Sequence, residues 1–288
     1  MPPSTTLRLA LACLLPLAAI ACAAPPATDP PVEPVVEATP RLYLLGEVHD
    51  NAEGHRERLE LLRQYAAGDA DIAIAMEQFD HERQADLDAA MARCADAACV
   101  IEAAASEKAG WNWEFYAPVI QLALDHDIPV LAANLSRADA SAVVKDGFAA
   151  LPEGLRATYL DRPLPAAMLQ AQVDAVREGH CNMLPETLLE PMARAQVARD
   201  VVMADTMLRA LADHEFVFLL AGNGHVNRDI GVPHWLIAHG NGQQLVATGY
   251  LERGNEAERA HFDSVHMVAP AEREDPCAGF AAGRGGAQ

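Results

Sequence analysis

The chain is poor in aromatic residues, which make up 5% of its 288 residues, and it contains only two lysines, Lys108 and Lys145. Acidic residues outnumber basic ones by 41 to 21, so the formal net charge is −20. Such a surface repels phosphate backbones, and no nucleic acid is expected as a partner. The chain also lacks a nucleophile elbow, a P-loop and a Gly-x-Gly-x-x-Gly motif, so serine-hydrolase and nucleotide chemistry are not expected.

Long apolar runs are also lacking, apart from one at the N-terminus. That run, Leu9 to Ala21, follows the single basic residue Arg8 and stops at Cys22. Its length and flanks predict a signal peptide over residues 1–21 rather than a membrane span. Ala19 to Cys22 resembles the lipobox of bacterial lipoproteins, with alanine where leucine is usual. We therefore expect a lipid anchor at Cys22, with ordinary cleavage after an Ala-x-Ala as the alternative.

Composition divides the rest of the chain into three parts. Residues 22–40 are rich in proline and acidic residues, which predicts a tether that does not fold. Residues 41–270 have the composition of one globular domain, and residues 271–288 form a Gly- and Ala-rich tail that we expect to be flexible. Export would place the protein in an oxidising compartment, where four cysteines can pair in three ways. The pairing that closes the smallest loop is Cys94 with Cys99, which leaves Cys181 to fix the tail through Cys277.

Short β-type runs alternate with helical patterns, and the runs are nearly continuous in apolar residues. This pattern predicts an α/β fold with a mostly parallel sheet that carries helices on both faces. The predicted strands are residues 41–45, 71–76, 128–135, 217–222, 244–251 and 264–269. The predicted helices are residues 54–68, 83–105, 114–127, 164–180 and 188–211. Residues 136–212 exceed what one crossover needs, so they predict a helical insertion between the third and fourth strands.

Polar residues follow the first four predicted strands at the point where each strand ends. Because the C-terminal ends of parallel strands share one edge, we expect these residues to line a common cleft. Glycines at two of the exits would allow sharp turns and a close approach to a ligand. The candidate residues are Glu47, His49, Glu77, Asn134, Arg137 and His225.

Three kinds of chemistry fit this set. His49, Glu77 and His225 could ligate a divalent metal such as zinc or manganese. The same histidines and carboxylates could instead form a general acid/base set. The third possibility is a polar cradle for the carboxylates of a ligand, with Arg137 as the charged clamp.

Two other stretches carry candidate residues. Trp111 to Pro118 concentrates aromatic side chains in a chain that has few of them, which predicts either a helix N-terminus on the core or a platform for a flat ligand. His180 and Met183 are candidate axial haem ligands, with an ordinary loop position as the alternative. His55 and His81 have the pattern of solvated helix residues.

Seven motifs in this order resemble the ChaN-like haem-binding lipoproteins, whose superfamily includes the Tiki metalloproteases and the erythromycin esterases. They span residues 41 to 270 and are LLGEVHDN, IAMEQF, W-x-W-x-x-Y-x-P, IPVLAANLSR, AQVARDVVMA, LLAGNGHVNRDIGVP and SVHMVAP. The resemblance implies an α/β fold and an exported, membrane-anchored lipoprotein on the periplasmic or outer surface. It also implies haem as the bound cofactor, a role in haem or iron uptake or storage, a homodimer that encloses haem, and an outer-membrane haem receptor as partner.

In that family a tyrosine can hold the iron and a histidine of the partner subunit can contact the propionates. Tyr116 lies in a matching motif, so the resemblance favours it as the iron ligand, with Tyr43 and Tyr65 as alternatives. The family's motif over residues 195–204 also implies that Gln196, Arg199 and Asp200 approach the cleft. Because the whole surface is acidic, an anionic haem needs local basic groups, for which Arg137, Arg194 and Arg199 are candidates.

The wider superfamily implies a different use of the same residues. In the Tiki-type metalloproteases the matching positions, His49 and His225, hold a metal that activates water, and Glu77 would be the third ligand. Glu47 would then carry the proton. A metal-dependent hydrolase is thus the alternative to a haem carrier, and a scaffold with an inert site is the third possibility.

Overall fold

The structure, a computed structural model, describes residues 39–106, 110–275 and 277–278. The predicted signal peptide, Cys22 and the tether up to residue 38 lie outside these residues. The described chain forms a six-stranded sheet in the order β3-β2-β4-β1-β5-β6, and every pair of neighbouring strands is parallel. The strands are β1 (Leu42–Leu45), β2 (Ile72–Asp80), β3 (Val130–Asn134), β4 (Phe216–Leu220), β5 (Leu245–Glu252) and β6 (Ser264–Val268).

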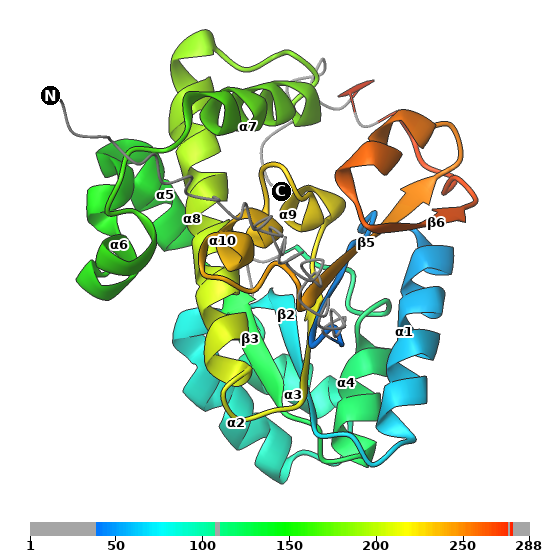
Figure 1. The fold of residues 1–288 in the computed structure, drawn as a ribbon. Coiled ribbons are helices and arrows are strands. Elements are labelled where there is room, and N and C mark those ends of the chain that lie inside the picture. The colour runs from blue at the N-terminus through cyan, green and yellow to red at the C-terminus, as the bar shows by residue number, and fades with distance from the viewer. Residues whose placement is uncertain (1–38, 107–109, 276, 279–288) are drawn as a thin grey trace, which may run out of the picture. The chain divides into compact units, whose positions relative to one another are not determined.

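Helices occupy the connections between strands, as the alternating pattern predicted. The α-helices are α1 (Ala52–Ala66), α2 (Gln84–Arg93), α3 (Ala97–Ala104), α4 (Ala117–Asp125), α5 (Arg137–Asp146), α6 (Glu153–Tyr159), α7 (Ala166–Gly179), α8 (Glu186–Ala210), α9 (Asn223–Val226) and α10 (Val232–Ala238). The described residues also form three short 3-10 helices, η1 (His81–Arg83), η2 (Gly147–Ala150) and η3 (Glu256–His261). The α/β class and the helical insertion between β3 and β4 are confirmed, since α5 to α8 occupy it (Figure 1). Among the described helices, none is long and apolar enough to cross a bilayer.

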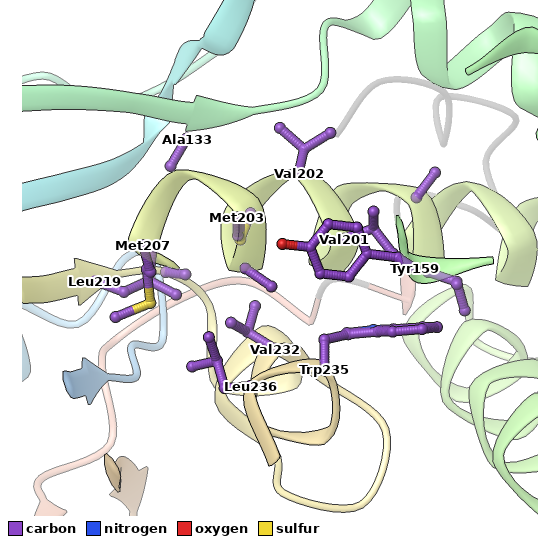
Figure 2. Close-up of a cluster of buried hydrophobic side chains, with 14 of the residues drawn as sticks. Ala133, Tyr159, Val201, Val202, Met203, Met207, Leu219, Val232, Trp235 and Leu236 are labelled. Atoms are coloured by element: carbon purple, nitrogen blue, oxygen red, sulfur yellow. The ribbon is translucent and has the colours of Figure 1, made fainter. Parts of the chain in front are cut away.

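Two hydrophobic cores form on the two faces of the sheet, because successive strand residues point to opposite sides. Leu42 and Leu44 face the core that contains α8 and α10, and Leu45 faces the core that contains α1 and α4. Figure 1 shows α8 along one side of the sheet and α1 and α4 along the other. In the α8 core, Met203 and Met207 meet Leu219 of β4 and Leu236 of α10 (Figure 2). Burial on both faces explains why the strands are continuous apolar runs.

One strand differs from the prediction. We predicted that β2 ends at Met76, but it continues to Asp80 and contains Glu77 and Gln78. β2 pairs with β4 up to Met76, and its register with β3 shifts between Met76 and Asp80. Glu77 therefore projects from a strand that extends beyond the end of its neighbour β4, rather than from a loop.

Both disulfides expected from the cysteine spacing are present. Cys94 pairs with Cys99 at the turn between α2 and α3, and Cys181 pairs with Cys277 across a sequence separation of 96 residues. Arg273 also forms ion pairs with Asp50 and Glu252. The described part of the C-terminal segment is thus bound to β5, to the loop after β1 and to the end of α7.

Candidate functional site

The C-terminal ends of β1, β2 and β4 bring together two histidines and two carboxylates. Glu47 and His49 lie directly after β1, Glu77 lies in the extended part of β2, and His225 lies in the short helix α9 after β4. Glu77 accepts a hydrogen bond of 2.8 Å from the backbone N–H of Gly222 and lies 3.5 Å from Nε2 of His225. The candidate residues from three different strands therefore share one site.

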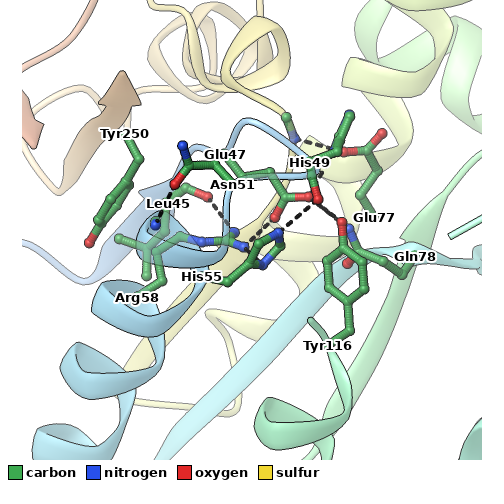
Figure 3. Close-up of polar contacts among 12 residues, drawn as sticks. Leu45, Glu47, His49, Asn51, His55, Arg58, Glu77, Gln78, Tyr116 and Tyr250 are labelled. Atoms are coloured by element: carbon green, nitrogen blue, oxygen red, sulfur yellow. Dashed lines mark hydrogen bonds and ion pairs between the residues drawn. The ribbon is translucent and has the colours of Figure 1, made fainter. Parts of the chain in front are cut away.

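Glu47 is the centre of a buried network (Figure 3). Its Oε1 accepts hydrogen bonds from Tyr116 Oη at 2.6 Å and from His49 Nδ1 at 2.7 Å, and its Oε2 pairs with Arg58. Burial opposes ionisation of this carboxyl, but the charge of Arg58 and the hydrogen bond from His49 outweigh it and hold its pKa well below the usual range. Glu47 is therefore a fixed negative charge under physiological conditions.

His49 is the exposed member of the site. Its side chain is 45% exposed, and its ring meets Trp111 edge-on with centroids 5.0 Å apart. Burial of the rest of the ring opposes protonation, but the hydrogen bond to Glu47 and the charges of Glu77 and Glu47 raise the pKa of His49 to about 9. His49 thus presents a protonated imidazolium to solvent at neutral pH.

The raised pKa of His49 predicts a pH-dependent contribution to stability. A pKa of about 9 in the folded protein exceeds the ordinary histidine value of 6.5, so the contribution is complete below pH 6.5 and is lost as the pH rises to about 9. Because the ring is half exposed, we expect about 1 kcal/mol or less. Urea unfolding of the wild type and His49→Gln at pH 6, 7.5 and 9.5 measures this contribution as the difference between their free energies of unfolding. A difference that does not shrink between pH 6 and 9.5 would contradict the prediction.

His225 forms a second histidine–carboxylate pair. Its Nδ1 donates to Oδ1 of Asp200 at 2.6 Å, and Nε2 of Gln172 donates to Oδ2 of Asp200 at 3.1 Å and to the carbonyl of Ile230 at 2.9 Å. Burial raises the pKa of Asp200, whereas the charges of Glu77 and Asp200 outweigh burial and raise the pKa of His225. The buried side chain of Gln172 links α7 to this pair.

Asn134 and Arg137 lie at the same edge but do not join the histidines. Asn134 ends β3, and its Oδ1 accepts a hydrogen bond of 2.5 Å from Arg199. Arg137 is the first residue of α5 and is exposed. Arg199 and Asp200, which the family's motif placed near the cleft, both contact site residues.

Of the two histidines predicted to be solvated helix residues, His55 was predicted wrongly. His55 is buried, stacks on Phe115 with ring centroids 4.7 Å apart, and donates from Nε2 to the carbonyl of His49 at 2.9 Å. Burial and the nearby charge of Arg58 lower the pKa of His55 to about 4, so it stays neutral. His81 is half-buried and lies 3.2 Å from the carbonyl of Asn134. Arg58, which we did not predict, is buried between His55 and Glu47.

Two of the haem-ligand candidates, Tyr116 and His180, lie in different parts of the fold. Tyr116 precedes α4, and its hydroxyl is buried and bonded to Glu47. Burial and the charge of Glu47 raise the pKa of this phenol far above its usual value, which disfavours a phenolate. His180 directly follows α7, where its Nδ1 lies 2.8 Å from the carbonyl of Val176, next to the Cys181 disulfide. Trp111 and Trp113 are half-buried around Tyr116, so the stretch serves both the core and the rim of the site.

Glycines at the strand ends are required by close contacts. A Cβ atom at Gly46 would lie 2.1 Å from Oδ1 of Asn223, and one at Gly222 would lie 3.1 Å from Nε2 of His49. A Cβ atom at Gly231 would lie 2.3 Å from the carbonyl oxygen of His225. Gly46 and Gly222 thus let the exits of β1 and β4 converge, as the sequence pattern suggested, and Gly231 lets the chain before α10 pass close to the backbone of His225.

Gly231→Ala is expected to lower the free energy of unfolding by about 1–3 kcal/mol, because the new methyl group would overlap the backbone of His225 and Asn227. The matched control is Gly224→Ala, whose Cβ would meet no atom within 4 Å, and we expect a change of about 0.5 kcal/mol or less. Urea unfolding curves of both variants test this. If both substitutions lower the free energy of unfolding equally, the backbone around Gly231 moves to accommodate the methyl group and the prediction is wrong.

A metal site is absent from the described residues. Across residues 39–106, 110–275 and 277–278, no group of three or more His, Cys, Asp or Glu side chains is arranged to hold a metal ion. Glu77 instead faces His225 Nε2, and its other oxygen binds the N–H of Gly222. The predicted ligand set of His49, Glu77 and His225 therefore lies together without the geometry of a metal centre.

Comparison with known families identifies the fold. The model of the family described as "Haem-binding uptake, Tiki superfamily, ChaN" matches residues 38–236, which is more than half of the chain. The chain belongs to this ChaN family. The match confirms the resemblance that the motifs had indicated.

A solved structure of a ChaN protein shows the same fold. ChaN of Campylobacter jejuni, described with cofacial haem binding, is 21% identical to this chain, with a TM-score of 0.60 over 73% of this chain and 80% of that one. An open conformation of the erythromycin esterase EreC is 14% identical, with a TM-score of 0.42 over 74% of this chain and 70% of that one. No curated protein matches the chain.

Proposed function

We propose that this ChaN-family protein binds haem as an exported lipoprotein, and that it carries or stores haem during haem or iron uptake. The observation that carries the proposal is the family match over residues 38–236. Anchoring through a lipid on Cys22, a place on the periplasmic or outer side of the outer membrane, and transfer to or from an outer-membrane haem receptor are parts of the same proposal. The order of signal peptide, Cys22 and acidic tether in the sequence supports them.

The rim of the site suits a flat anionic ligand. His49 is protonated at neutral pH and half exposed, and the indole of Trp111 lies beside it. An imidazolium next to an aromatic ring offers a charge-assisted hydrogen bond to a propionate and an apolar surface to a porphyrin. Arg137 is exposed at the start of α5 and can supply a second cation at this edge. Bound haem would supply an iron centre and an apolar ring.

The iron ligand remains a prediction. Tyr116, which the family resemblance favoured, would have to exchange its hydrogen bond to Glu47 for a bond to iron. His180 would bring an imidazole from the end of α7. A homodimer that encloses haem between two copies would let residues from both copies contribute, and it belongs to the same proposal.

Haemin titration of the purified, delipidated and metal-stripped protein tests the proposal through the Soret band. Tyr116→Phe, His180→Ala and Arg137→Ala are measured beside the wild type, and light scattering with and without haemin reports the oligomeric state. Tyr116→Phe keeps the ring in the core and removes only the hydroxyl. We expect a saturable Soret shift in the wild type.

Each outcome of this titration has a different meaning. Loss of the shift in Tyr116→Phe would identify the iron ligand, whereas an unchanged shift would remove Tyr116 and direct attention to His180. An unchanged affinity in Arg137→Ala would remove Arg137 as a propionate partner. If the wild type shows no saturable shift, the haem proposal is overturned.

A metal-dependent hydrolase is the second candidate, because His49 and His225 flank Glu77 and each imidazole is backed by a carboxylate. This arrangement holds the tautomer and orientation of both rings, as acid/base chemistry requires. Elemental analysis of the protein as isolated, and ester and peptide hydrolysis with and without chelator, test it. His49→Ala and His225→Ala should both abolish any such activity. The hydrolase candidate is excluded if the protein as isolated contains no metal and hydrolyses neither esters nor peptides.

A further inference from the structure

A separate cavity lies at the C-terminal edge of the sheet, on the side of β5. It has a volume of about 270 Å³ and is lined by Val48, Asn223, Gly224, Asn227, Leu251, Glu252, Asn255, Glu258 and Phe262. Val48 lies between Glu47 and His49 in the chain, and Gly224 precedes His225. The cavity therefore shares the exits of β1 and β4 with the histidine site, whereas Glu77 projects from β2 on the other side of β4.

The residues that line the cavity favour neither an anionic nor a cationic ligand. No lysine, arginine or histidine occurs among the described residues that line it, so it offers no cation to a phosphate or a propionate. The carboxylate of Glu252 is already satisfied, because it accepts hydrogen bonds from Asn51, Ala271 and Arg273. Glu258 is exposed, where solvent screens its charge. An anionic ligand is disfavoured, and no buried unpaired carboxylate calls for a cationic one.

Three asparagines supply the polar groups. Asn223 is held rigidly, since its side chain donates to the carbonyl of Tyr250 at 2.7 Å and accepts from the N–H of Tyr250 at 3.1 Å. Asn227 uses Oδ1 to accept a hydrogen bond from the N–H of Asp229 at 2.8 Å. Within the described part of the chain, Nδ2 of Asn227 and the side chain of Asn255 have no hydrogen-bond partner. Each such amide can donate to or accept from a hydroxyl group of a ligand.

An aromatic and aliphatic wall completes the cavity. Phe262 packs against Gly249, where a Cβ atom would lie 2.8 Å from the ring, so the position of the ring depends on that glycine. Leu251 and Val48 add apolar surface. Apolar walls with a few directed amides are typical of sites that recognise small polar molecules. At about 30 Å³ for each water molecule in the liquid, the volume equals about nine waters, which suits one six-membered ring and is too small for haem.

We propose that this cavity binds a small neutral polyhydroxylated molecule of monosaccharide size, independently of haem. The amides would bond its hydroxyl groups, and Phe262 would cover an apolar face of its ring. Gly224 provides the test, because a side chain there meets no atom within 4 Å and would extend into open space beside the cavity.

Saturation-transfer NMR with D-glucose, D-mannose and myo-inositol on the full-length delipidated protein tests the proposal. Glucose 6-phosphate and glucosamine are the charged comparisons. We expect saturable binding of at least one neutral polyol, at least 10-fold weaker binding in Gly224→Leu and Asn255→Ala, and no binding of glucose 6-phosphate. The matched control is Gly154→Leu, an exposed helical glycine outside the cavity whose Cβ also meets no atom within 4 Å, and it should bind like the wild type.

Several outcomes would overturn the proposal. One is the absence of a binding signal from all three polyols, and another is polyol binding that is unchanged in Gly224→Leu. A third is binding of glucosamine or glucose 6-phosphate that is at least as tight as binding of the neutral polyols. Haemin titration of the same samples separates this proposal from the haem proposal. Gly224→Leu should show the same Soret shift as the wild type while its polyol binding is lost. The haem proposal and the polyol proposal can therefore each be overturned without the other.

Discussion

Replacing Cys181 and Cys277 by serine is expected to lower the free energy of unfolding by about 4–5 kcal/mol. The disulfide joins positions separated by 96 residues, so it closes a loop that contains α8, β4, β5 and β6. A cross-link over so long a loop strongly restricts the unfolded chain, and its loss returns that conformational freedom. Urea unfolding monitored by circular dichroism gives the difference directly.

The second disulfide provides a matched control. Cys94 and Cys99 are separated by only five residues, and the same reasoning gives about 2 kcal/mol for their replacement by serine. The order of the two effects is the decisive result. If the Cys94/Cys99 variant is destabilised as much as the Cys181/Cys277 variant, then loop length does not determine the stabilisation.

The fold could be predicted from sequence because its main determinant is local. Nearly continuous apolar runs mark strands that are buried on both faces, and the structure contains all six predicted strands, of which only the edge strand β6 is largely exposed. The end of β2 could not be predicted in this way, since Glu77 and Gln78 look like residues of a loop. Glu77 is satisfied there by the N–H of Gly222 and the imidazole of His225, which follow β4 in the loop and in α9. Such a contact has no signature in the sequence around β2.

The site was predictable in part for the same reason. Glu47, His49, Glu77 and His225 stand at strand ends, and parallel strands must bring these ends together. His55 and Arg58 were missed because their charge suggested exposure. Their spacing with Leu59 and Leu62 nevertheless places all four on one face of α1, and that face is buried. A polar residue on an apolar stripe is the signal that could have identified them.

Replacing Arg58 by methionine should lower the free energy of unfolding by about 3–5 kcal/mol, because it leaves Glu47 as an uncompensated buried charge. Arg58 is 2% exposed and is paired with the equally buried Glu47. It also donates to Nδ1 of His55 at 2.7 Å. Adding Glu47→Gln to Arg58→Met should restore part of the loss, since no charge is then buried, and the double-mutant cycle measures the coupling. Arg209→Met, which breaks an exposed ion pair with Asp205, should cost about 1 kcal/mol or less.

The pH dependence of this loss follows from the lowered pKa of Glu47. A carboxyl with a depressed pKa stabilises the folded protein above its unfolded value, 4.5, and loses that contribution as the pH falls toward the folded value. Wild type should therefore lose this stabilisation as the pH falls below about 4.5, so its advantage over Arg58→Met should shrink in more acidic solution. Unfolding curves at pH 7, 5 and 3.5 give the trend. A difference that grows on acidification, or an Arg58→Met variant as stable as Arg209→Met, would show that Arg58 does not hold Glu47 as an ion in the folded protein.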